Sequence, residues 1–231
     1  MPLPEPASAK PAPRVLGEVL LLFLLVTLVI AALVRVPSEL VQRYLSAVAA
    51  GLFLFTPTLL LQRRGLYPAD YGLHLDDLAR SLRAFALAAL LVVPLFSLGY
   101  WLYLDHLCPR LPFWLTHYTR PQARALRLPP DLHWLALHQL VVVALPEEFF
   151  FRGYMQGRLS EVLPPRRALL LSSALFALGH LLVTPQVGSL AVFFPGLLFG
   201  LLRQHTGGVL AGGLLHALCN LLIDVLHRSL G

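Results

Sequence analysis

Seven apolar runs, most of them close to the length of a membrane span, constrain this chain more than any other feature. A helix of about 20 residues is about 30 Å long, which matches the hydrocarbon thickness of a bilayer. The runs lie at residues 15–34, 46–61, 85–104, 133–155, 168–183, 187–202 and 209–226. The fifth and sixth are short and are joined by Thr184 and Pro185, so a tilted or partly re-entrant pair is an alternative to two full spans. We therefore predict an all-α fold, a polytopic transmembrane bundle of about seven helices, with six to eight as the range.

Composition supports a bilayer as the solvent of this chain. Hydrophobic residues make up 57% and charged residues 13% of the sequence, whereas soluble domains carry about 25% charged residues. The net charge of +6 comes from basic residues in short stretches between the apolar runs. This pattern indicates loops held against an anionic membrane surface and not a nucleic-acid interface. The two cysteines, Cys108 and Cys219, make neither a disulfide framework nor a cysteine-based zinc site.

The chain divides into a short tail and one membrane domain. Residues 1–14 are rich in Pro and Ala, and residues 15–231 form the membrane domain, with a motif-bearing core at about 133–226. No small-residue cleavage site closes the first run, which favours an uncleaved signal anchor. Residues 62–84 predict a turn followed by an amphipathic interfacial helix. In the loop 105–132, Trp114 and Tyr118 are candidate interface anchors.

Basic residues predict the orientation of the helices. With the N-terminus in the cytoplasm, ten basic residues fall inside and seven outside. The ten are Lys10, Arg14, Arg63, Arg64, Arg80, Arg83, Arg158, Arg166, Arg167 and Arg203, and the seven are Arg35, Arg43, Arg110, Arg120, Arg124, Arg127 and Arg228. We expect a multi-pass protein of the cell (inner) membrane with a cytoplasmic N-terminus.

Polar side chains inside the later runs are the candidate functional residues, because ionisable groups in a bilayer are costly and usually functional. Helix geometry places them at one depth. Glu147 lies 11 residues before Arg158, or about 16 Å, and His180 lies 13 residues after Arg167, or about 20 Å. The full set is Glu147, Glu148, Arg152, Phe176, His180, His216 and Asn220. Because His216 and Asn220 reach a similar depth, we predict one shared site.

Spacing within this set separates the two glutamates. Glu148 and Arg152 are four residues apart and can form an ion pair along one helix face. That pair is equally consistent with a purely structural role. Glu147 lies about 100° around the helix, so its carboxylate is free for other work. His216 and Asn220 are also four residues apart and face the same way.

A carboxylate, two imidazoles and an amide are suited to activating water. Glu147 can take a proton from water, His180 can hold the water, and His216 and Asn220 can donate hydrogen bonds to an oxyanion. Neither a zinc-binding HExxH helix nor a serine nucleophile elbow occurs in the sequence. His180 or His216 alone would favour a hydrogen-bonded core residue, so the prediction depends on the whole set.

Small residues and one proline predict how the helices approach one another. Gly196 and Gly200 have the small-xxx-small spacing that permits close helix packing, and a similar cluster begins the last run. Pro146 can loosen the helix beside Glu147 and free backbone groups there. We interpret Ser172, Ser173 and Thr184 as packing residues and not as nucleophiles.

In this set the chain resembles the CPBP intramembrane proteases, which include the type II CAAX prenyl endopeptidases and the bacterial Abi proteins. The family pattern is EExxxR, FxxxH, a Gly-spaced aromatic helix and HxxxN or HxxxD. It matches EEFFFR at 147–152, FALGH at 176–180, FFPGLLFG at 193–200 and HALCN at 216–220. Each motif alone is weak, but the ordered set is specific. The resemblance covers about residues 140–225, and the N-terminal half resembles the family only in having more membrane helices.

The resemblance implies a protease whose cavity opens to the cytoplasmic side. It implies that Glu147 and His180 activate water, that His216 and Asn220 stabilise the oxyanion, and that Glu148, Arg152 and Phe176 support them. The family has been described as both glutamate-dependent and metal-dependent. We expect no required cofactor, with zinc on Glu147, His180 and His216 as the alternative.

The expected partner is a membrane-associated peptide or protein tail. Candidate substrates are C-terminal sorting tails, bacteriocin leaders, anti-sigma factors or CAAX-like tails. Two other functions remain open: a non-catalytic membrane binding or immunity protein, and a proton-coupled transporter. The transporter is disfavoured because the polar residues lie in the second half and no internal repeat is present.

Overall fold

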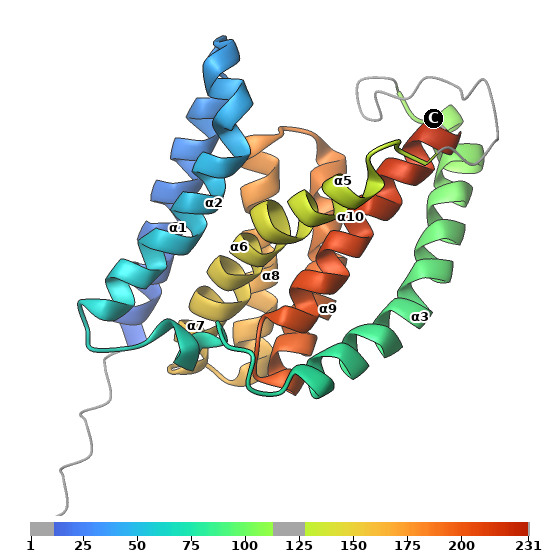
Figure 1. Ribbon diagram of the computed structural model, residues 1–231. Helices are drawn as coiled ribbons and strands as arrows, with labels where there is room; N and C mark the ends of the chain where they lie inside the picture. The colour runs from blue at the N-terminus through green and yellow to red at the C-terminus, as the bar shows by residue number, and fades with distance from the viewer. Residues whose placement is uncertain (1–11, 113–127, 231) are drawn as a thin grey trace, which may run out of the picture.

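The computed structural model describes residues 12–112 and 128–230, and within that part the chain is an all-α bundle of seven helices without strands (Figure 1). Five of these helices are long and apolar enough to cross a membrane. The predicted fold class is therefore confirmed. The candidate anchors Trp114 and Tyr118, and most of the predicted tail, lie outside the described residues.

The helices follow the predicted runs closely. They are α1 (Ala12–Val34), α2 (Glu39–Gln62), α3 (Leu78–Leu102), a fourth helix over Leu132–Ser160, α8 (Pro165–Val183), α9 (Phe193–Thr206) and α10 (Leu210–Leu230). The sixth run is divided, because a 3-10 turn at Val187–Val192 precedes α9. With only 14 residues, α9 is too short for a full span.

The fourth helix changes its winding along its length. Its α-helical parts are α5 (Leu132–His138), α6 (Leu145–Glu148) and α7 (Gln156–Ser160). Two π-helical segments join them, η4 (Gln139–Ala144) and η5 (Phe149–Met155). Short π-helical segments inside α-helices occur frequently at functional sites.

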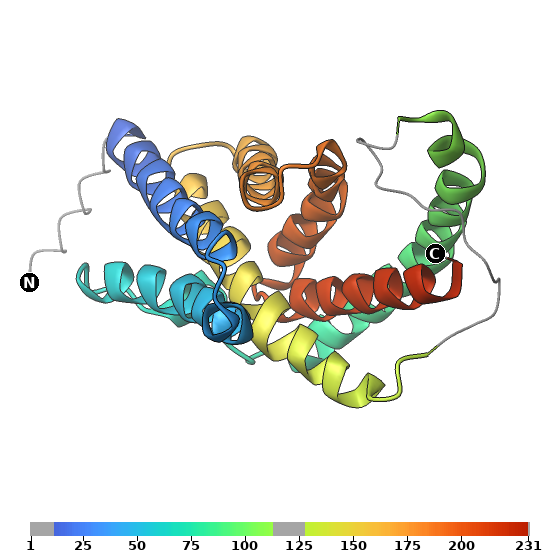
Figure 2. The same cartoon turned by 90° about the horizontal axis from the view of Figure 1, so that it is seen from above.

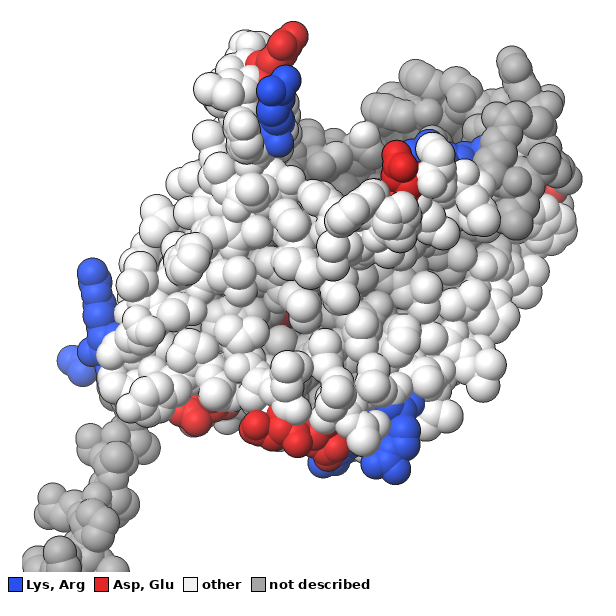
Figure 3. Space-filling view, viewed as in Figure 1, with Lys and Arg blue, Asp and Glu red and all other residues white. Residues whose placement is uncertain are grey.

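The fourth helix, Leu132–Ser160, crosses the centre of the bundle. Figures 1 and 2 place α1 and α2 on one side of it and α8, α9 and α10 on the other, with α3 at the outer edge beside α10. Three consecutive aromatic residues, Phe149, Phe150 and Phe151, are at most 2% exposed and pack with Phe23 of α1 and Phe176 of α8 in one core. The face in Figure 3 is largely uncharged at mid-height, and its charges gather at the two ends. That distribution suits a bundle that spans a bilayer.

The predicted interfacial helix in residues 62–84 is wrong. Residues Pro68–Tyr71 form a single 3-10 turn, and α3 then begins at Leu78 and continues into the membrane span. The carboxylate of Asp77 caps this helix by accepting the Arg80 backbone N–H at 2.9 Å. No Gly or Pro separates Leu78 from the apolar run at residue 85, so the two patterns join into one helix.

Close packing is confirmed at Gly200 and Gly213, whereas a Cβ atom on the predicted Gly207 would meet nothing within 4 Å. A Cβ atom on Gly200 of α9 would lie 2.3 Å from Leu169 Cδ1 of α8. A Cβ atom on Gly213 of α10 would lie 2.6 Å from Leu145 Cδ2 of α6. Neither distance leaves room for a methyl group, so glycine lets α8 approach α9 and lets α10 approach α6.

Candidate active site

The backbone around Glu147 and Glu148 is positioned by a proline between two π-helical segments. Pro146 has no N–H to donate to the preceding turn, and η4 and η5 flank the short segment α6. The hypothesis that Pro146 loosens the helix here agrees with this winding. Both glutamate side chains project from the middle of the fourth helix, Leu132–Ser160.

Glu148 lies in a fully buried ion network. Its Oε1 atom is 3.2 Å from Arg152 Nη1 and 3.0 Å from His216 Nδ1, so one oxygen contacts two partners. The predicted ion pair between Glu148 and Arg152 is therefore confirmed, and His216 is its third member. Arg152 has no exposed surface, and its guanidinium carbon lies 4.0 Å from the centre of the Phe176 ring. Phe176 thus stabilises the buried cation through its ring face.

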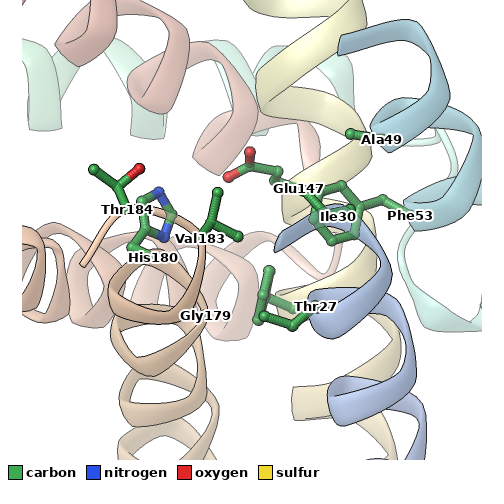
Figure 4. Close-up of a pocket in the computed structure, with 10 residues that line it drawn as sticks. Thr27, Ile30, Ala49, Phe53, Glu147, Gly179, His180, Val183 and Thr184 are labelled. Atoms are coloured by element: carbon green, nitrogen blue, oxygen red, sulfur yellow. The ribbon is translucent and has the colours of Figure 1, made fainter. Parts of the chain in front are cut away.

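Glu147 has a different environment and faces a cavity. Figure 4 shows its carboxylate pointing toward His180 and Thr184. The cavity has a volume of about 120 Å³ and is lined by both of these residues, together with apolar groups of α1 and α2 such as Ile30 and Phe53. A cavity of this size, with the polar groups of Glu147, His180 and Thr184 in its wall, has room for water molecules.

The hydrogen bonding of His180 leaves one ring nitrogen free. Its Nδ1 atom lies 3.0 Å from the backbone carbonyl oxygen of Phe176. A carbonyl oxygen only accepts, so Nδ1 carries the hydrogen and Nε2 keeps its lone pair in the neutral ring. The Phe176 ring packs edge-on against the imidazole at 4.4 Å between centroids and fixes its plane. His180 can therefore accept a proton or a hydrogen bond inside the cavity.

His216 connects the ion network to Glu147. Its Nδ1 atom contacts Glu148, and its Nε2 atom lies 4.0 Å from Glu147 Oε2. The imidazole stacks on Phe199 of α9, with ring centroids 5.0 Å apart and planes 13° apart. This arrangement fixes His216 with Nε2 turned to the carboxylate that faces the cavity.

Asn220 reaches a partner that sequence reasoning missed. Its amide nitrogen donates to Gln139 Oε1 at 3.0 Å. Gln139 begins the π-helical segment η4, and in the sequence it resembled an ordinary residue near the start of an apolar run. The hydrogen bond fixes the orientation of the Asn220 amide, one helical turn beyond His216.

The comparisons with known proteins agree with this geometry. Residues 129–222 match the model of a family described as type II CAAX prenyl endopeptidase Rce1-like. This match supports the resemblance of residues 129–222 to the CPBP family of intramembrane proteases. The family indicates a protease. No curated protein and no solved structure matches the chain.

The CPBP segment does not supply the whole cavity. Thr27 and Ile30 of α1 and Ala49 and Phe53 of α2 form one wall, and all four precede the matched residues. Sequence reasoning missed these residues, because apolar side chains in a membrane helix carry no signal of their own. It interpreted Thr184 as a packing residue, and the structure places Thr184 in the wall of the cavity.

Zinc held by Glu147, His180 and His216 is the alternative cofactor. Among the described residues, no group of three or more His, Cys, Asp or Glu side chains has an arrangement that could hold a metal ion. Glu147, His180 and His216 therefore do not form a zinc site with the side-chain positions seen here.

The position of the cavity brings two predictions into conflict. Ile30 lies near the end of α1 and Thr184 follows the end of α8, and the Arg35 guanidinium contacts the Leu182 carbonyl oxygen at 3.2 Å. The cavity therefore extends toward the end of the bundle where α1 and α8 finish, opposite the N-terminal end of α1 (Figure 1). A cytoplasmic N-terminus would place this end outside, whereas the CPBP resemblance implies a cytoplasmic opening. Both statements remain predictions, and a cavity that opens at this end satisfies only one of them.

Proposed function

We propose that the chain is an intramembrane endopeptidase that hydrolyses a peptide bond in a membrane-associated or membrane-embedded protein tail. The observation that carries this proposal is the cavity shared by the Glu147 carboxylate and His180. A general base and an imidazole with a free nitrogen, in a space of water size, are the parts that water activation needs. No metal is part of the proposed mechanism.

In the proposed reaction, Glu147 removes one proton from a water molecule positioned by His180. The resulting hydroxide forms a bond to the carbonyl carbon of the substrate, and the carbonyl electrons move to the oxygen. The carbon–nitrogen bond then breaks when the leaving amine receives the proton that Glu147 holds. One water molecule is consumed, and a new carboxyl group and a new amine are released.

His216 and Asn220 are proposed to stabilise the oxyanion. His216 Nε2 donates a hydrogen bond when the ring is protonated, and Glu148 stabilises that positive ring through Nδ1 at 3.0 Å. Arg152 balances the remaining charge of Glu148 and holds its carboxylate in place. Fixed donors of this kind stabilise developing charge without reorganisation.

The substrate is proposed to place an apolar segment beside α1 and α2. Most of the cavity wall is apolar, including Ile30, Phe53, Phe151 and Val183. Apolar walls of this kind fit a CAAX-like tail, a C-terminal sorting tail or a bacteriocin leader better than a polar soluble peptide.

The experiment compares the wild-type chain with Glu147→Gln. Both proteins are purified in detergent and incubated with a panel of membrane-peptide substrates, with and without a chelator, and products are identified by mass spectrometry. Cleavage by the wild type that is lost in Glu147→Gln and insensitive to chelator supports the proposal. Chelator-sensitive cleavage would assign a metal-dependent mechanism to the same site.

Equal cleavage by both proteins would remove the catalytic role from Glu147. Binding of a peptide without cleavage, by the wild type and the variant alike, would favour the non-catalytic membrane binding protein. Proton flux in sealed vesicles, abolished by Glu147→Gln, would favour the transporter.

A further inference from the structure

A second charged cavity lies at the end of the bundle where α1 begins and α2 ends. It has a volume of about 320 Å³ and is lined by Arg14, Val15, Glu18, Arg64 and Arg158. None of these residues lines the Glu147 cavity. We propose that it binds the phosphate group of an anionic phospholipid and thereby ties α1, α2 and α7 together.

The charge of the cavity favours an anion. Three of its lining side chains are arginines and one is a carboxylate, Glu18. Glu18 is already used, because it accepts from Tyr154 Oη at 2.6 Å, pairs with Arg64 and lies 3.4 Å from Arg158 Nη2. Arg14 makes no hydrogen bond or ion pair within the described part of the chain. An excess of positive charge therefore faces the empty space.

A buried, unpartnered donor of Arg158 is the second observation. Arg158 has no exposed surface, and it uses Nη1 for Glu161 and Nη2 for Glu18. Its Nε–H has no hydrogen-bond partner among the described residues. A buried donor without an acceptor is costly. A phosphate oxygen is an acceptor that matches the planar fork of a guanidinium.

The height of the cavity in the bundle favours a lipid as the source of the phosphate. Arg14 is in the first turn of α1, and Arg64 follows the last residue of α2, Gln62, so both lie where the apolar spans end. Charged side chains gather along this end of the bundle (Figure 3). Basic pockets between membrane helices at head-group level bind anionic lipid head groups. Exposed leucines of α1, Leu20, Leu21 and Leu24, continue from the cavity along the lipid-facing surface and can contact acyl chains.

The test uses the full chain in an uncharged detergent. Thermal unfolding is followed with added phosphatidylglycerol, phosphatidylcholine or inorganic phosphate, and native mass spectrometry counts the bound lipids. We expect phosphatidylglycerol to raise the unfolding midpoint and to remain bound as one copy. Phosphatidylcholine should shift the midpoint less, because its choline cation opposes the arginines, and inorganic phosphate should act only at much higher concentration.

Two variants and a control locate the effect. Arg14→Gln and Arg64→Gln should each weaken phosphatidylglycerol binding about fivefold, the effect of losing one basic charge near the membrane surface. The control is Arg43→Gln, since Arg43 is an exposed arginine near the start of α2, at the opposite end of the bundle. It should bind like the wild type.

Three results would overturn the proposal. One is an unfolding midpoint of the wild type that phosphatidylglycerol does not change. Another is an equal shift of the midpoint by phosphatidylglycerol in Arg14→Gln, Arg64→Gln and Arg43→Gln. The third is inorganic phosphate acting at the same concentration as the lipid, which would assign the cavity to free phosphate. None of these readouts depends on peptide cleavage, so the proposed protease function is tested separately.

Discussion

The cavity around Glu147 and the ion network around Glu148 are adjacent on one helix, yet they offer opposite environments. The Glu147 side chain is 18% exposed and shares its cavity with His180, whereas the Glu148 side chain is 0% exposed and contacts Arg152 and His216. A carboxylate next to a water-sized space can exchange protons. A carboxylate fixed between the Arg152 guanidinium and the His216 imidazole can only hold them in place. The difference separates reaction from support within two consecutive residues.

The largest expected effect concerns Glu147, the carboxylate that faces the cavity. Glu147→Gln should lower kcat for peptide cleavage by about 10³-fold, within the range attributed to a general base. The unfolding midpoint should change little, because Gln has nearly the same volume and Glu147 contacts no buried cation closely. Enzyme kinetics and thermal unfolding of the same preparations check both parts. A variant that loses activity only by unfolding would contradict the assignment of Glu147 to chemistry.

Substitutions in the ion network around Glu148 should lower the free energy of unfolding. Glu148→Gln leaves Arg152 as a buried cation without its carboxylate, which costs about 3–5 kcal/mol of unfolding free energy. The double variant Glu148→Gln with Arg152→Met removes both charges and should recover a large part of that loss. Denaturant unfolding in mixed micelles measures the unfolding free energies of the wild type and both variants. Equal stability of the wild type and the single variant would show that the network does not support the fold.

Substitutions at Asn220 and Gln139 test whether this hydrogen-bonded pair contributes to catalysis. Asn220→Ala should lower kcat about 10²-fold if its amide stabilises the oxyanion. Gln139→Leu leaves the amide in place but removes the partner that orients it, so we expect a loss of about tenfold. KM should change little in both variants. A change confined to KM would instead indicate a substrate-binding role.

Close packing of α10 against α6 depends on Gly213, and a pair of glycine substitutions tests this dependence. Gly213→Ala places a methyl group against Leu145 and should cost about 1–3 kcal/mol of stability. The matched control is Gly99→Ala in α3, where a Cβ atom meets nothing within 4 Å. The control should be neutral or up to about 1 kcal/mol more stable, because Ala favours helix over Gly. Similar destabilisation in both variants would contradict the packing argument.

The smallest expected effect concerns Tyr71, a buried side chain outside the membrane spans. Burial and the hydrogen bond from its hydroxyl to Glu161 raise the pKa of Tyr71 to about 12. The native state therefore retains the phenol proton more strongly than the unfolded state. The resulting stabilisation is complete below about pH 10 and is lost as the pH rises toward 12.

The comparison with Tyr71→Phe isolates this effect. The wild type should be more stable at pH 8 by about 1 kcal/mol, the value of one hydrogen bond. Its advantage should shrink as the pH rises from 10 to 12. Thermal unfolding across this pH range measures the difference, and an advantage that stays constant would contradict the role of the phenol proton.

The sequence by itself determined the membrane fold and the candidate set. Span length and apolar composition follow from bilayer thickness, so the runs located the helices, although α2 and α3 begin at Glu39 and Leu78, before the predicted starts at 46 and 85. Intramembrane charge is costly, so Glu147, Glu148, Arg152, His180 and His216 were found without any structure. The spacing of Glu148 and Arg152 also predicted their ion pair, because that contact lies within one helix.

Only the tertiary structure decided which groups meet across helices. The contact of His216 with Glu148, the hydrogen bond of Asn220 with Gln139 and the wall that α1 and α2 contribute all join distant parts of the chain. Periodicity fixes which face a side chain occupies on its own helix. It carries no information about the rotation and approach of the neighbouring helix, which depend on packing at positions such as Gly200 and Gly213.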